Sequence, residues 1–484
     1  MLRFRVEPLC VFFAAVAGFA ASGRAQDYWD LERIARQARL NAEAERAAGG
    51  PFIAAPLPGG GGEDSLAFTF NDPIAQLREE ARFLTRLQVT TPGPDLGGMR
   101  EGESLLDIVQ TDNTTESIWV FSRHLRLTGD AEFDPNTALA WVYVMSHPAT
   151  AEEGGSGPNG YYRVYNCGWA VVAEPEYRAA TGDASFLPYA RTCAAFIASN
   201  PLDLRTSLNV QVEAWAAGAL RDFAVEQGDE SLRLAANRLG DAVRAVVEAN
   251  PSVLAQEQWA MSGGSVLWGV LRAWFADQPG GRAWANLYGP MTSEIDPVGV
   301  WRLAATNWYG LGRHEAWRAT GNPEFFASHR SIHAFLMDAD GDDDGGIPTT
   351  DPAAVTADET WVSNYFSFMF FDKAVPGFEV VLAADAASAP AGGSWSISAA
   401  VANHDAAVKR SLLIALAGRR AGSDRVVVLA GPATRTIPRE TARGADASLR
   451  VPPRVRPGDY VLTLVARDAA GGPVLRSTLS LAVQ

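Results

Sequence analysis

Polar and aromatic side chains stand at the starts of six apolar, helix-spaced segments of this chain. On two of these segments a pair of polar residues is four positions apart, Asp112 with Glu116 and Asn209 with Glu213. Residues four apart lie on the same face of a helix. Aromatic rings stack on the C–H faces of a sugar, amides and Arg bind its hydroxyls, and two carboxyls can act across a glycosidic bond. This combination of side chains predicts a carbohydrate site.

The candidate catalytic residues are the carboxylates at these segment starts: Asp112, Glu116, Glu213 and Asp358. The candidate substrate-binding residues are the aromatic, amide and arginine side chains beside them: Tyr162, Arg163, Asn166, Trp169, Asn209, Trp259, Trp301 and Trp361. Each prediction has an alternative. Asp112 and Glu116 could only cap a helix start. Glu213 has apolar neighbours and could pair with an Arg in the core, and the Trp side chains could be core residues.

The segment 340–351 matches the calcium-binding loop of EF-hand proteins. It has Gly345 at position 6 for the sharp turn, and carboxylates at positions 1, 3, 5 and 12: Asp340, Asp342, Asp344 and Asp351. Position 12 is Asp rather than Glu, and Pro348 occupies position 9. We expect a structural Ca²⁺ ion held by these four Asp residues. The alternative is a solvated acidic turn.

Glycine-containing turns divide the chain into pairs of helices. The turns at Gly129, Gly182, Gly228 and Gly321, with a further turn at Gly280, lie about 40 to 55 residues apart. A Gly can end a helix in the left-handed conformation, and a following Asp or Asn can cap the next helix. The spacing predicts a repeated helix hairpin. The expected inner and outer helices are 116–121 onward with 136–145, 161–180 with 184–199, 205–226 with 230–249, 257–276 with 281–296, 301–319 with 322–337, and 357–371 with 73–88. If the inner helices line a ring, their polar starts converge on one rim.

The sequence changes character near Pro376, after which short β-rich segments alternate with turns. The expected strands are 378–384, 394–402, 411–417, 425–430, 434–437, 446–451, 458–467 and 474–483. This number of short strands predicts a β-sandwich. The segment 457–464 resembles the sixth strand of bacterial immunoglobulin-like or fibronectin-type-III-like modules, which implies that type of domain over 377–484.

The first 25 residues are typical of a secretory signal peptide. They combine Arg3 and Arg5 with an apolar run over 9–21 and a small-residue cleavage site before Gln26. The expected domains are therefore the signal peptide 1–25, an N-terminal helix with a Gly/Pro-rich connector over 26–70, a helical toroid over 71–375 and the sandwich. The mature protein is expected to be secreted or periplasmic, with no membrane attachment after cleavage.

The remaining composition excludes some partners. A net charge of −15 argues against binding nucleic acid or anionic membranes. Cys167 and Cys193 follow the signal segment on consecutive predicted helices, and they could form a disulfide in an oxidising compartment or remain buried thiols. His329 and His333 share a face of a predicted outer helix, where we expect surface or packing roles.

A ring of helix pairs joined by Thr-Gly-Asp turns, with acids and aromatics at inner-helix starts, resembles the (α/α)6-toroid glycosidases and polysaccharide lyases over about 110–372. The resemblance implies cleavage of a glycosidic bond in an oligo- or polysaccharide by carboxylate general acid/base catalysis. For a lyase it implies that Tyr162, Tyr165 or a His abstracts a proton while Asn166 or Arg163 steadies a uronate carboxyl. Two alternatives are a calcium-stabilised module that binds glycans or proteins without catalysis and, more remotely, a terpenoid-cyclase-like ring that uses the acidic run 338–344.

Overall fold

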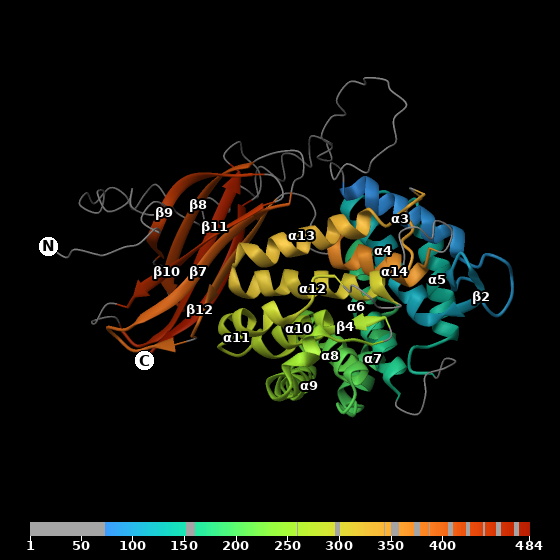
Figure 1. The fold of residues 1–484 in the computed structure, drawn as a ribbon, viewed down its shortest axis with the longest axis horizontal. Coiled ribbons are helices and arrows are strands. Elements are labelled where there is room, and N and C mark those ends of the chain that lie inside the picture. The colour runs from blue at the N-terminus through green and yellow to red at the C-terminus, as the bar shows by residue number, and fades with distance from the viewer. Residues whose placement is uncertain are drawn as a thin grey trace, which may run out of the picture. The chain divides into compact units, whose positions relative to one another are not determined.

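The computed structural model describes residues 73–484 except 152–159, 259, 296–300, 343, 350–357, 372–377, 387, 405–409, 423–425, 439–440, 452–455 and 469–473. The predicted signal peptide, the 26–70 connector, Trp259 and Asp351 lie outside the described residues. The chain forms a helical toroid followed by a β-rich region (Figure 1). It divides into two compact units, Phe68–Ala316 with Ser328–Val375, and Met1–Ala67 with Trp317–Ala327 and Pro376–Gln484.

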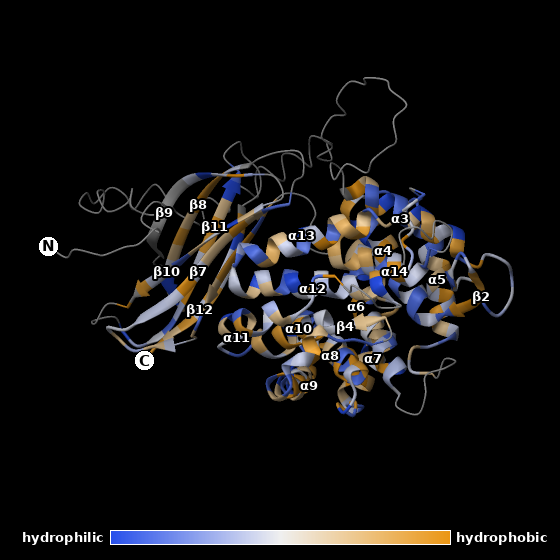
Figure 2. Cartoon of the chain, in the orientation of Figure 1, coloured by the Kyte–Doolittle hydropathy of each residue, from blue (hydrophilic) through white to orange (hydrophobic). Residues whose placement is uncertain are grey.

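Helical hairpins build the toroid, as the spacing of the glycine turns predicts. The inner helices are α4 (Thr111–Thr128), α6 (Tyr161–Thr181), α8 (Ser207–Gln227), α10 (Gly263–Val270), α12 (Arg302–Thr320) and α14 (Thr360–Phe371). The outer helices are α3 (Pro73–Leu87), α5 (Asp134–Ser146), α7 (Leu187–Ser199), α9 (Glu230–Ala249), α11 (Gly281–Tyr288) and α13 (Pro323–Met337). Outer helix α9 carries both polar and apolar residues, whereas the short inner helix α10 is mainly apolar (Figure 2).

The helix ends follow the predicted glycine chemistry. Gly129, Gly182 and Gly228 have φ values of 71°, 77° and 66°, and each donates its backbone N–H to the preceding helix. Only glycine adopts this left-handed conformation without strain. Asp229 then caps α9 by accepting a hydrogen bond from Leu232 N. The Asp residues after the first two glycines do not cap a helix, because α5 and α7 begin several residues later.

Close contacts between backbones and large rings join the inner helices side by side. A Cβ atom at Gly264 of α10 would lie 2.0 Å from the carbonyl oxygen of Trp308 on α12. Gly168 of α6 lies against Trp215 of α8. Gly218, which is also in α8, lies against Trp268 of α10. The absence of a Cβ lets these helices approach closely. These contacts, with those of Gly310 in α12 to Phe370 in α14, of α14 to α4 and of α4 to α6, close the ring.

Aromatic side chains fill the middle of the ring. Trp215 lies between Trp169 and Trp308, with ring centroids 4.6 and 5.2 Å apart, and Tyr365 lies 5.0 Å from Trp308. Phe368 packs edge-on against Trp169 and Trp215. The centre of the toroid is therefore solid core, and a substrate site has to lie at a rim.

Two parts of the toroid differ from the prediction. The segment expected as a helix over 257–276 is a small hairpin of β3 (Glu257–Gln258) and β4 (Met261–Ser262), followed by α10 and a π-helical turn over Leu271–Phe275. Ser262 starts α10 late because its hydroxyl accepts a hydrogen bond from Gly264 N. A hairpin of β1 (Met99–Gly102) and β2 (Leu105–Gln110), which the sequence pattern did not predict, precedes α4.

Histidine and cysteine side chains in the toroid are packing residues. His329 and His333 are buried and stack on Phe370 and Phe366. This confirms a packing role for them. Cys167 and Cys193 are free buried thiols, the second of the two alternatives for these residues.

The β-rich region consists of two sheets. One sheet has the order β10 (Thr441–Arg450), β7 (Ser394–Asn403), β5 (Phe378–Ala384), and the other has the order β6 (Ser388–Ala389), β12 (Val474–Val483), β11 (Gly458–Asp468), β8 (Arg410–Arg420), β9 (Val426–Ile437). Both sheets contribute apolar side chains to one core, among them Trp395, Ile397, Leu462 and Leu464. The segments expected as two strands over 425–437 form the single strand β9, with irregular pairing near Leu416.

Among the residues that the structure describes, no helix combines the length and apolar character needed to cross a bilayer.

Candidate functional site

Two carboxyl groups at the start of α4 contact the start of the neighbouring inner helix. Asp112 and Glu116 lie on one face of α4, as their spacing predicts, and both are buried. The Tyr162 hydroxyl of α6 donates a hydrogen bond to Asp112 Oδ2 at 2.7 Å. One turn further along, the Tyr165 hydroxyl donates to Glu116 Oε1 at 3.0 Å. The starts of α4 and α6 therefore lie at the same rim.

Inner helix α14 completes the surroundings of Glu116. Asn364 Nδ2 lies 3.4 Å from Glu116 Oε2, and the Tyr365 hydroxyl is hydrogen-bonded to that of Tyr165. Burial raises the pKa of Glu116 well above its usual value, and the neighbouring Asp112 charge raises it further. Glu116 therefore ionises less readily than an exposed carboxyl and lies one helical turn below Asp112.

The β1 strand and the residues before α14 add two more carboxyls. Gly102 of β1 pairs with Glu359 in an antiparallel bridge. Glu359 Oε2 accepts a hydrogen bond from Trp361 Nε1 at 2.7 Å, and burial, opposed by this bond and assisted by the Glu101 charge, raises the pKa of Glu359 to about 7. The Glu101 charge also raises the pKa values of Glu116 and Tyr365. We call Glu101, Asp112, Glu116 and Glu359 the rim carboxyls.

Half-buried aromatic rings lie on two sides of the rim carboxyls. Trp301 contacts Trp361, the ring that holds Glu359, with centroids 5.7 Å apart. Tyr161 contacts Tyr162, the ring that holds Asp112, with centroids 6.3 Å apart. Trp301 and Tyr161 thus place apolar faces within reach of solvent beside the acids, and the half-buried Arg163 is two residues from Tyr161.

Glu213 and Asn209, predicted as rim residues, contact the backbone of the segment that precedes α8. Glu213 Oε2 accepts a hydrogen bond from Leu202 N at 3.1 Å, and Asn209 Nδ2 donates to Asp203 O at 2.7 Å. Both side chains therefore hold the chain segment that precedes α8. Burial raises the pKa of Glu213 to about 7, and no charge of another candidate acid contributes. The structure does not bring Glu213 to the rim carboxyls, and neither does it pair Glu213 with an Arg of the described chain.

Trp169 and Asn166 are also unsuited to the predicted contact with a sugar. Trp169 has no exposed surface and lies in the aromatic centre of the ring, so the core alternative describes it. Asn166 is 1% exposed on the same helix. Among the predicted rings that the structure describes, Trp301 is the one with a partly exposed face, and Trp361 lies directly behind it.

Asp358 is the predicted catalytic acid that the structure places elsewhere. Its side chain is 2% exposed, and its Oδ2 atom has no hydrogen-bond partner among the described residues. Burial raises the pKa of Asp358 to about 8, with further contributions from the charges of Asp344, Asp342 and Glu103. Asp358 therefore belongs with the acidic loop at 340–346 rather than with Asp112 and Glu116.

The acidic loop forms a compact turn. Asp340, Asp342 and Asp344 each offer a carboxylate oxygen, and these oxygens lie within 4.8 Å of one another. Asp340 accepts hydrogen bonds from Asp344 N and Gly345 N at 3.2 and 3.0 Å, and Arg86 forms an ion pair with Asp344. This oxygen-rich arrangement suits a hard divalent cation such as Ca²⁺.

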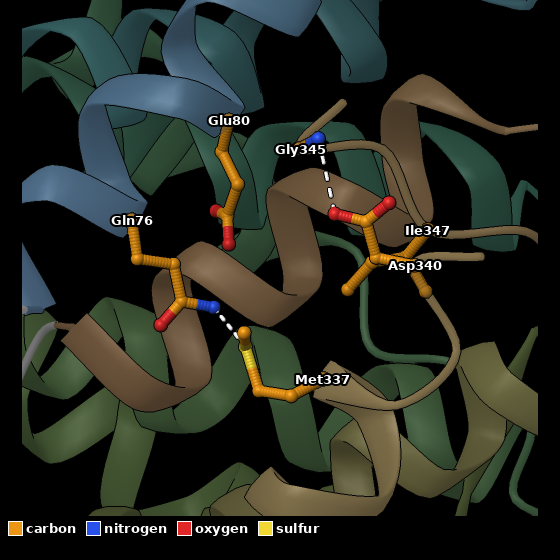
Figure 3. A pocket seen from close by; sticks show the side chains of 6 residues that line it. All are labelled: Gln76, Glu80, Met337, Asp340, Gly345 and Ile347. Carbon is orange, nitrogen blue, oxygen red and sulfur yellow. Dashed lines mark hydrogen bonds between the residues drawn. The ribbon is translucent and has the colours of Figure 1, made fainter. Parts of the chain in front are cut away.

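A small cavity adjoins the loop on the side of α3. It has room for about one water-sized sphere, about 10 Å³. Its lining residues are Gln76, Glu80, Met337, Asp340, Gly345 and Ile347 (Figure 3). The Glu80 carboxyl at this cavity accepts a hydrogen bond from Ser367, and burial raises its pKa well above the usual range.

Several site residues were missed from the sequence. Glu101 lies in the unpredicted hairpin, although Gly102-Glu103-Ser104 between two apolar positions is a turn signal that could have indicated one. Glu359 directly follows the predicted acid Asp358 in the sequence, and its residue type alone does not distinguish it from that neighbour. Asn364 and Tyr365 carry no local signal, because their contacts to α4 and α6 depend on closure of the ring.

No protein-family model and no curated protein sequence matches the chain. Solved structures similar to it include the α-1,6-mannanase GH76A of Salegentibacter sp. HEL1_6, with 11% identity over 62% of this chain and 98% of that one and a TM-score of 0.40. A GH76 α-mannanase of Bacteroides thetaiotaomicron has 12% identity over 62% and 94%, with a TM-score of 0.45. A GH127 β-L-arabinofuranosidase of Geobacillus stearothermophilus T6 has 8% identity over 85% and 91%, with a TM-score of 0.39. At this level of similarity, the function has to be argued from the side chains themselves.

Proposed function

We propose that this protein is a carbohydrate-active enzyme that hydrolyses a glycosidic bond of an oligo- or polysaccharide. The observation that carries the proposal is the group of rim carboxyls on α4, on β1 and just before α14, bordered by the half-buried rings of Trp301 and Tyr161. Acids beside aromatic faces are the side chains that glycoside hydrolysis requires. The predicted signal peptide supports export as part of the same proposal.

Asp112 and Glu359 are the pair that we assign to the reaction. Asp112 Oδ1 accepts a hydrogen bond from Asn113 N at 2.9 Å, and Oδ2 accepts one from Tyr162. These donors and the start of α4 stabilise a negative carboxylate. Asp112 is therefore the base that takes a proton from the attacking water.

Glu359 supplies the proton on the other side of the bond. Trp361 fixes one of its carboxyl oxygens, and Trp301 extends from Trp361 toward solvent as a stacking surface. The proton passes from Glu359 to the glycosidic oxygen as the C–O bond breaks, while the oxygen of water bonds to the anomeric carbon. Glu116, beneath Asp112, keeps Tyr165 and Asn364 in place.

The lyase alternative receives less support from the geometry. Burial and the nearby Glu116 charge raise the pKa of Tyr165 well above its usual value. A phenol in that state does not abstract a proton at neutral pH. The Tyr162 hydroxyl donates a hydrogen bond to Asp112. The negative charge of the Asp112 carboxylate likewise disfavours a phenolate at Tyr162.

The test is a panel of oligo- and polysaccharides incubated with the full chain and assayed for new reducing ends and for unsaturated products. We expect reducing ends on at least one substrate, with a loss of about 10²–10⁴-fold in kcat/KM for Glu359→Gln. Glu248→Gln, an exposed acid on outer helix α9, is the matched control. Unsaturated products would favour the lyase, and binding without cleavage would favour the non-catalytic module. Full activity of Glu359→Gln would remove Glu359 from the mechanism.

A further inference from the structure

The buried carboxylate of Asp358 is not used by the proposed reaction. Its Oδ2 atom lacks a hydrogen-bond partner among the described residues. It lies directly against the acidic loop, since a Cβ atom at Gly346 would be 2.8 Å from it. Burying a carboxylate without a partner is costly unless a cation or proton neutralises it. The position of Asp358 therefore indicates that this place either holds a proton or receives a cation.

The surrounding charges point to the same conclusion. The Asp340, Asp342 and Asp344 carboxylates lie on the same loop, with one oxygen of each within 4.8 Å of the others. Glu103 is joined to Asp358 through the backbone, since Glu103 N donates a hydrogen bond to Asp358 O. Arg86 forms an ion pair with Asp344 from the exposed side of this group. Three carboxylates that approach one another this closely favour a cation between them.

We propose that Asp340, Asp342 and Asp344 bind one Ca²⁺ ion directly, that the buried Asp358 carboxylate beside the loop binds it through a water molecule, and that this ion fixes the backbone that carries Glu359. The last part of this inference rests on the proposed function. One oxygen of each of the three loop carboxylates lies within 4.8 Å of the others, whereas Asp358 lies outside that group. Carboxylates and a bridging water match the preference of Ca²⁺ for several oxygen ligands.

A short backbone ladder connects the proposed ion to the rim. Pro348 pairs with Asp358 in an antiparallel bridge, and Glu359 N donates a hydrogen bond to Ile347 O at 3.1 Å. On the other side, Glu103 N donates to Asp358 O at 3.0 Å. Ile347 and Pro348, which follow the acidic loop, thus pair with Glu359 and Asp358. An ion that orders the loop also orders this ladder and the Glu359 backbone.

Binding is tested by titrating CaCl₂ into the EDTA-treated full chain in a calorimeter and by thermal melts with and without Ca²⁺. We expect one site with a Kd of about 1 mM or tighter, a range found for extracellular modules, and a higher Tm with Ca²⁺. Asp358→Asn and Asp342→Asn should each weaken binding at least about tenfold, because a carboxylate that holds the ion is lost. Asp338→Asn, an exposed acid just before the loop, is the matched control and should bind like the wild type.

If Asp358→Asn binds Ca²⁺ as tightly as the wild type does, the assignment of Asp358 is wrong. If the wild type binds no Ca²⁺, the proposed site itself is wrong. Asp342 is exposed, so Asp342→Asn keeps the test valid if the Asp358 variant does not fold. Amide hydrogen exchange tests the link to the rim. Ca²⁺ should slow exchange at Ile347 and Glu359, and equal exchange rates with and without the ion would refute the link.

These measurements separate the two proposals. Calcium binding and slower exchange in a protein that cleaves no glycan would leave the ion site intact and remove its catalytic purpose. Conversely, a glycosidase that loses activity in Glu359→Gln but binds no Ca²⁺ would retain the proposed function and refute the present inference.

Discussion

The starts of α4 and α8 carry the same spacing of polar residues and use it in opposite ways. In α4, Asp112 and Glu116 bind side chains of the neighbouring inner helices α6 and α14. In α8, Asn209 and Glu213 bind the backbone of the segment that leads into their own helix. The comparison teaches that a four-residue spacing selects a helix face but not its partner. The acids of α4 are joined to other inner helices, whereas Glu213 is joined to the segment before its own helix.

The largest effect that tests this comparison is the loss of activity on changing Asp112. Asp112→Asn removes the base while preserving the shape of the side chain, so kcat/KM should fall about 10²–10⁴-fold. The Tm should fall slightly, because the charge at the start of α4 and one hydrogen-bond acceptor are lost. The exposed Asp338→Asn variant is the matched control. An Asp112→Asn enzyme with wild-type kcat/KM would mean that α4, like α8, uses its acids only for structure.

The second effect concerns the pH dependence of stability at α8. Burial raises the pKa of Glu213 from 4.5 to about 7, so the folded state holds a proton that the unfolded state has released between these values. The free energy of unfolding should therefore fall as pH rises from 4.5 to 7, by up to about 3 kcal/mol. Glu213→Gln cannot ionise and should remove this part of the slope. Urea denaturation of both proteins at pH 5 and 8 measures it, and parallel pH profiles would contradict the assignment.

The smallest effect distinguishes how the two helices begin. Thr206 caps α8 by accepting a hydrogen bond from Asn209 N, whereas Gln110 at the start of α4 makes no side-chain cap. Thr206→Ala should lower the free energy of unfolding by about 1 kcal/mol. Gln110→Ala should lower it by less, as measured in the same urea experiment. Equal losses would show that capping does not distinguish the two starts.

Local chemistry explains which parts of the fold could be predicted. The left-handed glycines at Gly129, Gly182 and Gly228 follow from short-range sterics, and helical periodicity gave most helix boundaries to within a few residues. The β1–β2 hairpin escaped prediction because Leu105 and Leu106 are exposed, so its pattern of apolar residues does not report burial. The break in the predicted helix at 257–276 depends on Gly263 packing against the backbone of Leu254.

The site was less predictable than the fold because its contacts span long stretches of sequence. The acids at the start of α4 were identifiable by type and spacing, but their partners on α6 are about 50 residues away in the chain. Asp358 and Glu359 are neighbours in sequence, yet strand alternation sends their side chains to different places. One faces the acidic loop and the other is held by Trp361. Periodicity along one helix carries no information about either outcome.

The aromatic plug formed by Trp169, Trp215, Trp308 and Tyr365 has a consequence for how a polymer would be handled. A glycan strand cannot be threaded through the hole of this torus, because indole and phenol rings occupy it. Such a strand has to lie across the mouth, and its two fragments have to depart by the side from which it arrived.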